Sequence, residues 1–263
     1  MSALAAAAIG GVAGFSIFLG LPVARLRGLS TPLQGFLNAL ALGVLLFLLW
    51  DILSHASSPV ESSLAAVRIG RPANFVSLVV IFAGGLAAGL LTLTYANRRL
   101  LGRARGVTGQ ASPRSLAMAI ATGLGFHNLS EGLAIGQSAA SGALAFAGVL
   151  VIGFALHNIT EGFGIAAPMT TSDTRPSWAF LGLAGLVGGG PTVIGTMIGL
   201  FATSAYLSVL FLALAAGALI WVINEMFGVA KRLNSPPSLG WGLLTGFLVA
   251  YSADLTLTYL TLG

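Results

Sequence analysis

Eight apolar segments follow one another along this chain, each long enough to cross a lipid bilayer. A transmembrane helix needs roughly 20 consecutive, mainly apolar residues. Only 7% of the residues are charged, whereas a soluble domain carries about 25%. The sequence therefore predicts an all-α polytopic membrane protein, with eight transmembrane helices in one bundle and a single transmembrane domain over residues 1–263. The expected helices cover about 3–24, 33–54, 73–95, 115–138, 143–167, 177–202, 205–228 and 239–261.

The basic residues predict how the helices are oriented. Cytoplasmic loops of membrane proteins carry an excess of Lys and Arg. Only Arg68 and Arg71 fall on one side of the predicted membrane. We therefore expect both termini to be extracytoplasmic, in a multi-pass protein of the cytoplasmic membrane. The net charge of +5 does not indicate a nucleic-acid partner, because the basic residues lie in loops between spans. The residues assigned to the cytoplasmic side are Arg25, Arg27, Arg98, Arg99, Arg103, Arg105, Arg114, Arg175, Lys231 and Arg232.

One short phrase occurs twice, in the fourth and fifth predicted helices. The pattern His-Asn-x-Ser/Thr-Glu-Gly begins at His127 and again at His157. On a helix, residues four apart share a face, so each His lies beside the Glu of its own phrase. At 1.5 Å per residue, both histidines lie about 15–18 Å from the predicted cytoplasmic ends of their helices. Two antiparallel helices would thus bring His127, Glu131, His157 and Glu161 together near the middle of the membrane.

These residue types predict a metal site. An ionisable side chain at mid-membrane costs roughly 2.5–3.5 kcal/mol, so four at one depth need a compensating interaction. Interhelical polar bonds, which average about 0.6 kcal/mol, and a proton relay without metal are the alternatives. Nitrogen and oxygen ligands without sulfur fit Zn²⁺, Fe²⁺ or Mn²⁺ and disfavour Cu⁺, and the chain has no Cys. Asn128 and Asn158 can add neutral oxygen ligands. Gly132 and Gly162 are expected to let the two helices approach each other closely.

Other polar or irregular positions have two readings each. Asp51 and His55 are four residues apart near the outer end of the second span, and Asp254 lies in the outer half of the eighth. They form either an entrance that captures metal or ordinary solvated residues at the membrane interface. The run from Gly188 to Pro191 interrupts the sixth span. It is either a hinge with carbonyls facing the metal path or a simple kink.

With its paired phrases and eight spans, the chain resembles the ZIP (Zrt/Irt-like) metal transporters, in their bacterial branch. The resemblance implies a metal centre on the fourth and fifth spans and net movement into the cytoplasm. It implies that the two His and two Glu form the primary site, with Asn128 and Asn158 in an adjoining one. Many relatives have Glu directly before the Pro of the sixth span, where Gly190 stands here. The resemblance implies a binuclear or mononuclear centre, and this departure from the family pattern favours one principal metal in this chain.

The predicted function is uptake of a divalent transition metal, zinc above all and also iron, manganese or cadmium, without an organic cofactor. The expected partners are the metal ions and the lipid bilayer, and the Gly-rich spans would allow a homodimer. No G-x-x-x-x-G-K-S/T motif is present, so a gradient must drive any transport. The alternative is an intramembrane metal-dependent hydrolase that activates a bound water. The absence of H-E-x-x-H, and polar residues spread from the outer to the inner end, favour a transporter over an enzyme.

Overall fold

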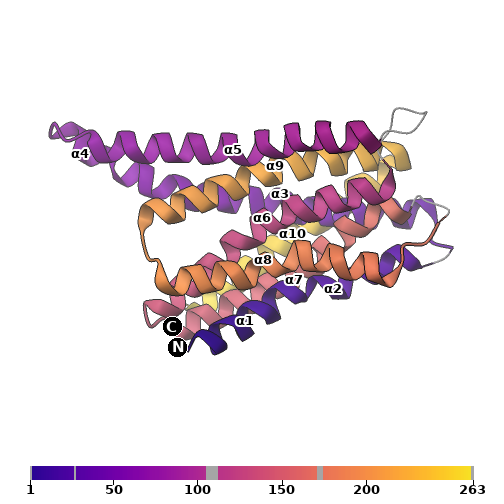
Figure 1. The fold of residues 1–263 in the computed structure, drawn as a ribbon, viewed down its shortest axis with the longest axis horizontal. Coiled ribbons are helices and arrows are strands. Elements are labelled where there is room, and N and C mark those ends of the chain that lie inside the picture. Colours follow the sequence, from indigo (N-terminus) through magenta and orange to yellow (C-terminus); the bar gives the residue numbers. More distant parts are fainter. Residues whose placement is uncertain (1, 27, 105–111, 171–173, 262–263) are drawn as a thin grey trace.

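The computed structural model describes residues 2–26, 28–104, 112–170 and 174–261, and these form long helices running side by side (Figure 1). The expectation of an all-α polytopic membrane protein is confirmed. Six of the described segments are long and apolar enough to cross a membrane. The helices are α1 (Ala3–Phe15), α2 (Ile17–Gly20), the 3-10 helix η1 (Leu21–Arg25), α3 (Thr31–Ser62), α4 (Leu64–Arg68), α5 (Ala73–Ala104), α6 (Pro113–Ala140), α7 (Leu144–Thr170), α8 (Trp178–Phe201), α9 (Ala205–Leu233) and α10 (Pro236–Thr261).

The first predicted span is not one continuous helix. It divides into α1, α2 and η1, and the break falls at Ser16. The Ser16 hydroxyl donates to the carbonyl of Ala13 at 2.7 Å, and such a local bond competes with the regular helical pattern. The second predicted span is longer than expected, because α3 continues well past residue 54 to Ser62. The break in the first span matters for the site, since it leaves the carbonyl of Ala13 beside α7.

The helices pack in two groups. The first group, defined here as α1, α2, α6, α7 and α8, has α6 packed along α8 and α7 against α1 and α2. The second group consists of α3, α5, α9 and α10, with α3 against α10 and α5 against α9. The two groups meet mainly where α6 contacts α9 and where α7 contacts α3. Both copies of the motif therefore belong to the first group and lie close to its boundary with the second.

Glycine brings the backbones close together inside each group. A Cβ on Gly195 of α8 would collide with the carbonyl of Leu129 on α6. In the second group, a Cβ on Gly217 of α9 would collide with the carbonyl of Leu86 on α5. Between the groups, Gly123 of α6 instead faces the side chain of Val222 on α9. Backbone contacts thus hold each group together, whereas hydrocarbon side chains lie across this part of their boundary.

The glycines of the motif pack differently from what the sequence predicts. Gly132 does not lie between α6 and α7; a Cβ there would meet the carbonyl of Thr192 on α8. Gly162 lies against Ile17 and Gly20 at α2. The prediction that both glycines bring the two motif helices together is wrong, because the His and Glu side chains already occupy the space between α6 and α7. Each glycine instead lets its helix approach a third one.

The ends of the bundle agree with the predicted separation of basic residues. The guanidinium of Arg25 donates to the carbonyl of Pro176, and that of Arg114 donates to the carbonyl of Arg175 at 3.5 Å. These residues lie at the end opposite the two chain termini (Figure 1). Both termini therefore share one end, as expected, and their extracytoplasmic location stays a prediction. Arg27 and Arg105 lie outside the described residues, as do the side chains of Arg98, Arg99 and Arg103.

The contact between α6 and α8 makes a prediction about stability. Gly195→Ala forces a methyl group into the carbonyl of Leu129, and overpacking of this kind costs about 1–3 kcal/mol. Gly182→Ala on the same helix is the matched control, because a Cβ there meets nothing within 4 Å. We expect thermal unfolding in detergent to show a lower melting temperature for Gly195→Ala only. Equal melting temperatures of the two variants would contradict the close contact.

Candidate metal centre

The two copies of the motif lie near the midpoints of α6 and α7, in the interior of the bundle. His127 and Glu131 on α6 and Glu161 on α7 are almost completely buried. The His157 side chain is slightly more open, with 14% of its surface exposed. The helical spacing therefore turns both His and both Glu toward the space between the helices, as the sequence predicts. Burial of so many ionisable groups in one place requires strong mutual interactions.

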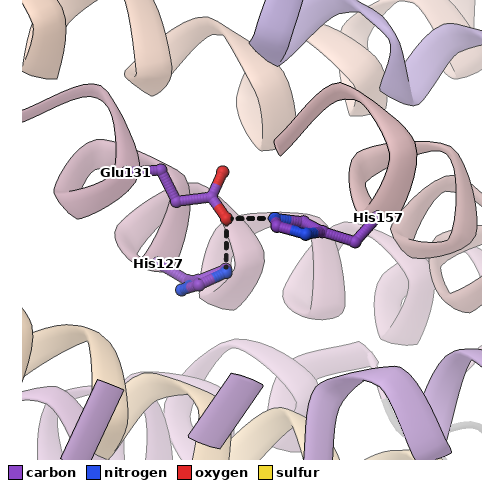
Figure 2. A group of neighbouring side chains, drawn as sticks. All are labelled: His127, Glu131 and His157. Atoms are coloured by element: carbon purple, nitrogen blue, oxygen red, sulfur yellow. Dashed lines mark hydrogen bonds and ion pairs between the residues drawn. The ribbon is translucent and has the colours of Figure 1, made fainter. Parts of the chain in front are cut away.

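Glu131 is the centre of this cluster. Its Oε1 atom lies 3.1 Å from Nε2 of His127 and 2.5 Å from Nε2 of His157, and Figure 2 shows both rings directed at the same oxygen. The three ligand atoms lie within 4.8 Å of one another. Glu161 stands beside them, with its Oε1 atom 3.5 Å from Nε2 of His127. Two imidazoles and two carboxylates thus converge from two helices, which is a donor set that suits zinc and similar divalent metals.

The two Asn side chains connect the copies reciprocally. Asn128 donates to Oε2 of Glu161 at 3.0 Å, and Asn158 faces Oε2 of Glu131 at 3.5 Å. Each amide also donates to a backbone carbonyl of a third helix. Asn128 binds the carbonyl of Gly188 on α8 at 3.0 Å, and Asn158 binds that of Ala13 on α1 at 2.9 Å. Each copy therefore orients the carboxylate of the other and anchors it to a neighbouring helix.

Several oxygens around the cluster have no donor. Oδ1 of Asn128, Oδ1 of Asn158 and Oε1 of Glu161 are buried without a hydrogen-bond partner. A buried acceptor without a partner costs about 1–3 kcal/mol. A cation placed among these oxygens would satisfy them, so the residues present fit a metal ion. The hydroxyls of Ser130 and Thr160 each donate to the His carbonyl of their own helix.

The predicted entrance residues lie together at the outer end, but they do not form a second cluster of ligands. Nδ1 of His55 is 3.2 Å from Oδ1 of Asp51, and Asp254 on α10 is close enough to interact electrostatically with both. Among the described residues, the trio of His127, Glu131 and His157 is the group of three whose ligand atoms converge. Asp51 also lies within electrostatic range of His127, and the role of these residues as an entrance stays a prediction.

The Gly-rich run of the sixth span does not interrupt the helix, and one of its carbonyls is directed at the candidate centre. Pro191 lies within the continuous helix α8, and the carbonyl of Gly188 faces the centre by accepting from Asn128. A side chain at position 190 would be directed away from the centre. A Cβ there would meet open space, and Leu186 and Ile194, on the same face of the helix, are exposed. A Glu in place of Gly190 would thus point away from this centre, so its absence does not remove a ligand.

Sequence reasoning missed the carbonyl of Ala13. No pattern in the chain marks it, because a backbone carbonyl carries no residue signature. The Gly-Gly-Gly-Pro run was the only available signal for the equivalent carbonyl of Gly188.

Comparison with known families agrees with this geometry. A family model described as ZIP Zinc transporter matches residues 103–251, which is more than half of the chain and includes both motif copies and helices α6 to α9. The chain belongs to the ZIP family. A search of curated proteins found no match. ZIP proteins are membrane transporters of divalent metals and not enzymes, so the membership argues against the alternative of an intramembrane hydrolase.

The central place of Glu131 makes a prediction about metal binding. Glu131→Gln keeps the shape of the side chain but removes the charge shared by both histidines. We expect the affinity of the purified ZIP protein for Zn²⁺ to fall by about 100-fold or more, since even residues that only orient ligands contribute 10–100-fold. Isothermal titration calorimetry measures the affinity for Zn²⁺. The control, Glu61→Gln in the exposed last turn of α3, should bind like the wild type.

Proposed function

We propose that this ZIP transporter carries zinc, with iron, manganese or cadmium as further substrates, across the cytoplasmic membrane into the cytoplasm through the centre on α6 and α7. The observation that supports this most strongly is the carboxylate of Glu131, which lies within 3.1 Å of two imidazole nitrogens at the midpoint of the bundle. Two carboxylates balance the charge of a divalent ion. The loaded centre would then be nearly neutral, which lowers the cost of holding an ion in a medium of low dielectric constant.

Entry from the outside would begin at Asp51, His55 and Asp254. The side chain of His55 is 70% exposed and that of Asp51 is 30% exposed, so both are accessible to a hydrated ion. Two carboxylates attract the ion electrostatically, and the imidazole offers a ligand as water is lost. Asp51 also acts electrostatically on His127. The entrance and the centre thus form two successive stages of one route.

Transport requires that the centre open to each side in turn, and the packing supports a relative movement of the two groups. Contacts between backbones, such as that of Gly195 with Leu129, hold each group rigid. At the boundary, Gly164 of α7 faces the thioether of Met226 on α9. Apolar side chains can change rotamers as one surface slides past another, whereas a carbonyl packed on glycine cannot yield. The first group would therefore carry the metal, while the second presents the outer and inner routes.

The first test of the function is uptake by proteoliposomes that contain a fluorescent chelator. We expect the wild-type protein to take up Zn²⁺, and the double variant His127→Ala/Glu161→Ala to lose this uptake while it remains folded. Fe²⁺, Mn²⁺ and Cd²⁺ assayed in parallel rank the substrates. A folded wild-type protein that binds zinc tightly but gives no flux would overturn the transporter, and assays for hydrolysis of lipid substrates would follow.

The movement of the two groups can be tested by cross-linking, because the chain has no Cys of its own. Gly123→Cys with Val222→Cys joins α6 to α9 across the boundary, where these residues are in contact. We expect its disulfide to stop zinc uptake and a reducing agent to restore it. Gly10→Cys with Thr196→Cys joins α1 to α8 within the first group, where the two Cβ positions are 3.0 Å apart. This control disulfide should leave uptake intact, and equal inhibition by both would contradict the movement.

A further inference from the structure

Asn38 is a buried polar side chain that the centre and the entrance leave unexplained. It lies in α3 with 1% of its surface exposed. Its Nδ2 atom is 3.4 Å from the carbonyl of Met226 on α9, a long hydrogen bond, and its Oδ1 atom has no partner. A buried amide oxygen without a donor costs about 1–3 kcal/mol, so it calls for a reason.

Its neighbours place Asn38 on the inner side of the metal centre. Met226 is fully buried, and its Sδ and Cε atoms lie 3.3 and 3.2 Å from where a Cβ on Gly164 would stand. Ala41, about one turn along α3 from Asn38, lies 3.8 Å from the same point. Gly164 follows Glu161 by three residues on the same face of α7, which is about 4.5 Å further inward. Met226, whose carbonyl accepts from Asn38, therefore packs on α7 on the inner side of Glu161.

Helix α3 carries a polar side chain toward each of its two ends, Asn38 and Asp51. Asp51 lies toward the outer end, thirteen residues from Asn38 and therefore about 20 Å away along the helix. Between them the buried residues are apolar, with Ala41, Leu45 and Leu48 at helical spacing. The first group of helices holds the metal centre opposite this apolar stretch. A metal that leaves the centre in the inward direction would thus meet Asn38 as the next polar side chain of α3.

Polar groups continue from Asn38 to the inner surface. Gly35, about one turn further inward, has the side chains of Ser235 and Ser238 3.4 Å from its Cβ position. The two serine hydroxyls are hydrogen-bonded to each other at 2.9 Å and are partly buried. Ser235 lies in the turn between α9 and α10, and Ser238 lies in the first turn of α10. Asn38 is therefore followed by hydroxyl groups that a hydrated ion can use.

We propose that Oδ1 of Asn38 is the first group that binds the divalent cation on the inner side, as the ion leaves Glu161. This inference rests on the proposed function and adds the release route to it. A carboxamide oxygen is a neutral ligand that suits a hard or borderline cation. Conduction requires sites that bind well enough to accept the ion and weakly enough to release it. A neutral oxygen beyond two carboxylates meets this need, because it attracts the ion without trapping it.

The test compares the Asn38→Leu and Asn38→Asp variants of the full chain in assays of Zn²⁺ uptake and of Zn²⁺ binding. Leucine removes both the oxygen and the amide, whereas aspartate keeps an oxygen ligand, loses the Nδ2 donor to Met226 and adds a negative charge. We expect Asn38→Leu to lower the maximal rate of Zn²⁺ uptake about tenfold, which corresponds to ~1.4 kcal/mol at the slow step. Its equilibrium affinity for Zn²⁺ should stay unchanged, because the centre is intact. Asn38→Asp should transport faster than Asn38→Leu, because it keeps an oxygen ligand, but more slowly than the wild type, because its charge holds the ion more tightly.

Asn74→Leu is the matched control, because Asn74 also bonds between helices, accepting from Tyr206 at 2.5 Å, but lies exposed and away from the route. It should transport like the wild type. Equal losses in Asn38→Leu and Asn38→Asp would overturn the inference and leave Asn38 as a tie between α3 and α9. A normal rate of Zn²⁺ uptake in Asn38→Leu would overturn the inference too. If leucine impairs folding, Asn38→Ala takes its place, because alanine also removes the amide oxygen. Absence of uptake by the wild type would instead reject the proposed function itself.

Discussion

A carboxylate placed between two imidazoles in the interior of a bundle must be held firmly, because water cannot solvate it there. Glu131 is in this position, within 3.1 Å of both His127 and His157. An ion in a medium of low dielectric constant is stable only where its partners are close and well oriented. The amide of Asn158 approaches the second oxygen of Glu131, and that of Asn128 binds Glu161. The packing of α1, α2 and α8 around the two motif helices keeps this arrangement in place.

The reciprocal role of the two Asn residues explains why the motif helices need neighbours beyond each other. Asn128 binds the carbonyl of Gly188 on α8, and Asn158 binds that of Ala13 on α1. Close approach at Gly132 and Gly162 brings these neighbours within reach. The consequence is a compact unit in which the position of each carboxylate depends on a backbone that cannot shift independently. The proposed movement of the whole unit would therefore leave the geometry at the centre unchanged.

The boundary between this unit and the second group of helices is formed by side chains and not by close backbone contacts. Val222 and Met226 of α9 present flexible hydrocarbon and thioether groups to glycines of α6 and α7. Such a surface resists sliding less than interlocked backbones do. The facing helix α3 carries polar groups toward its two ends, at Asp51 and Asn38, with apolar residues between them. A rigid unit that holds the candidate centre, next to a helix with polar groups near its two ends, fits the proposed route with an outer and an inner opening.

The sequence by itself determined the fold class, the number and approximate limits of the long helices, and the convergence of the motif. Helical spacing and the depth of each phrase decided that His127 and Glu131 meet His157 at one level, and these properties are local to each helix. The resemblance of the sequence to the ZIP family is confirmed by the family model, which matches residues 103–251.

Tertiary structure alone decided which neighbour each helical face meets. A periodic pattern shows which residues share a face, but it carries no information about the helix that packs on that face. For this reason the glycines of the motif were assigned to the wrong contact, and the carbonyl of Ala13 was missed. The same reason explains why the pattern could not show that position 190 faces away from the centre. It also could not show that Asn38 bonds to Met226 of α9 on the inner side of the centre.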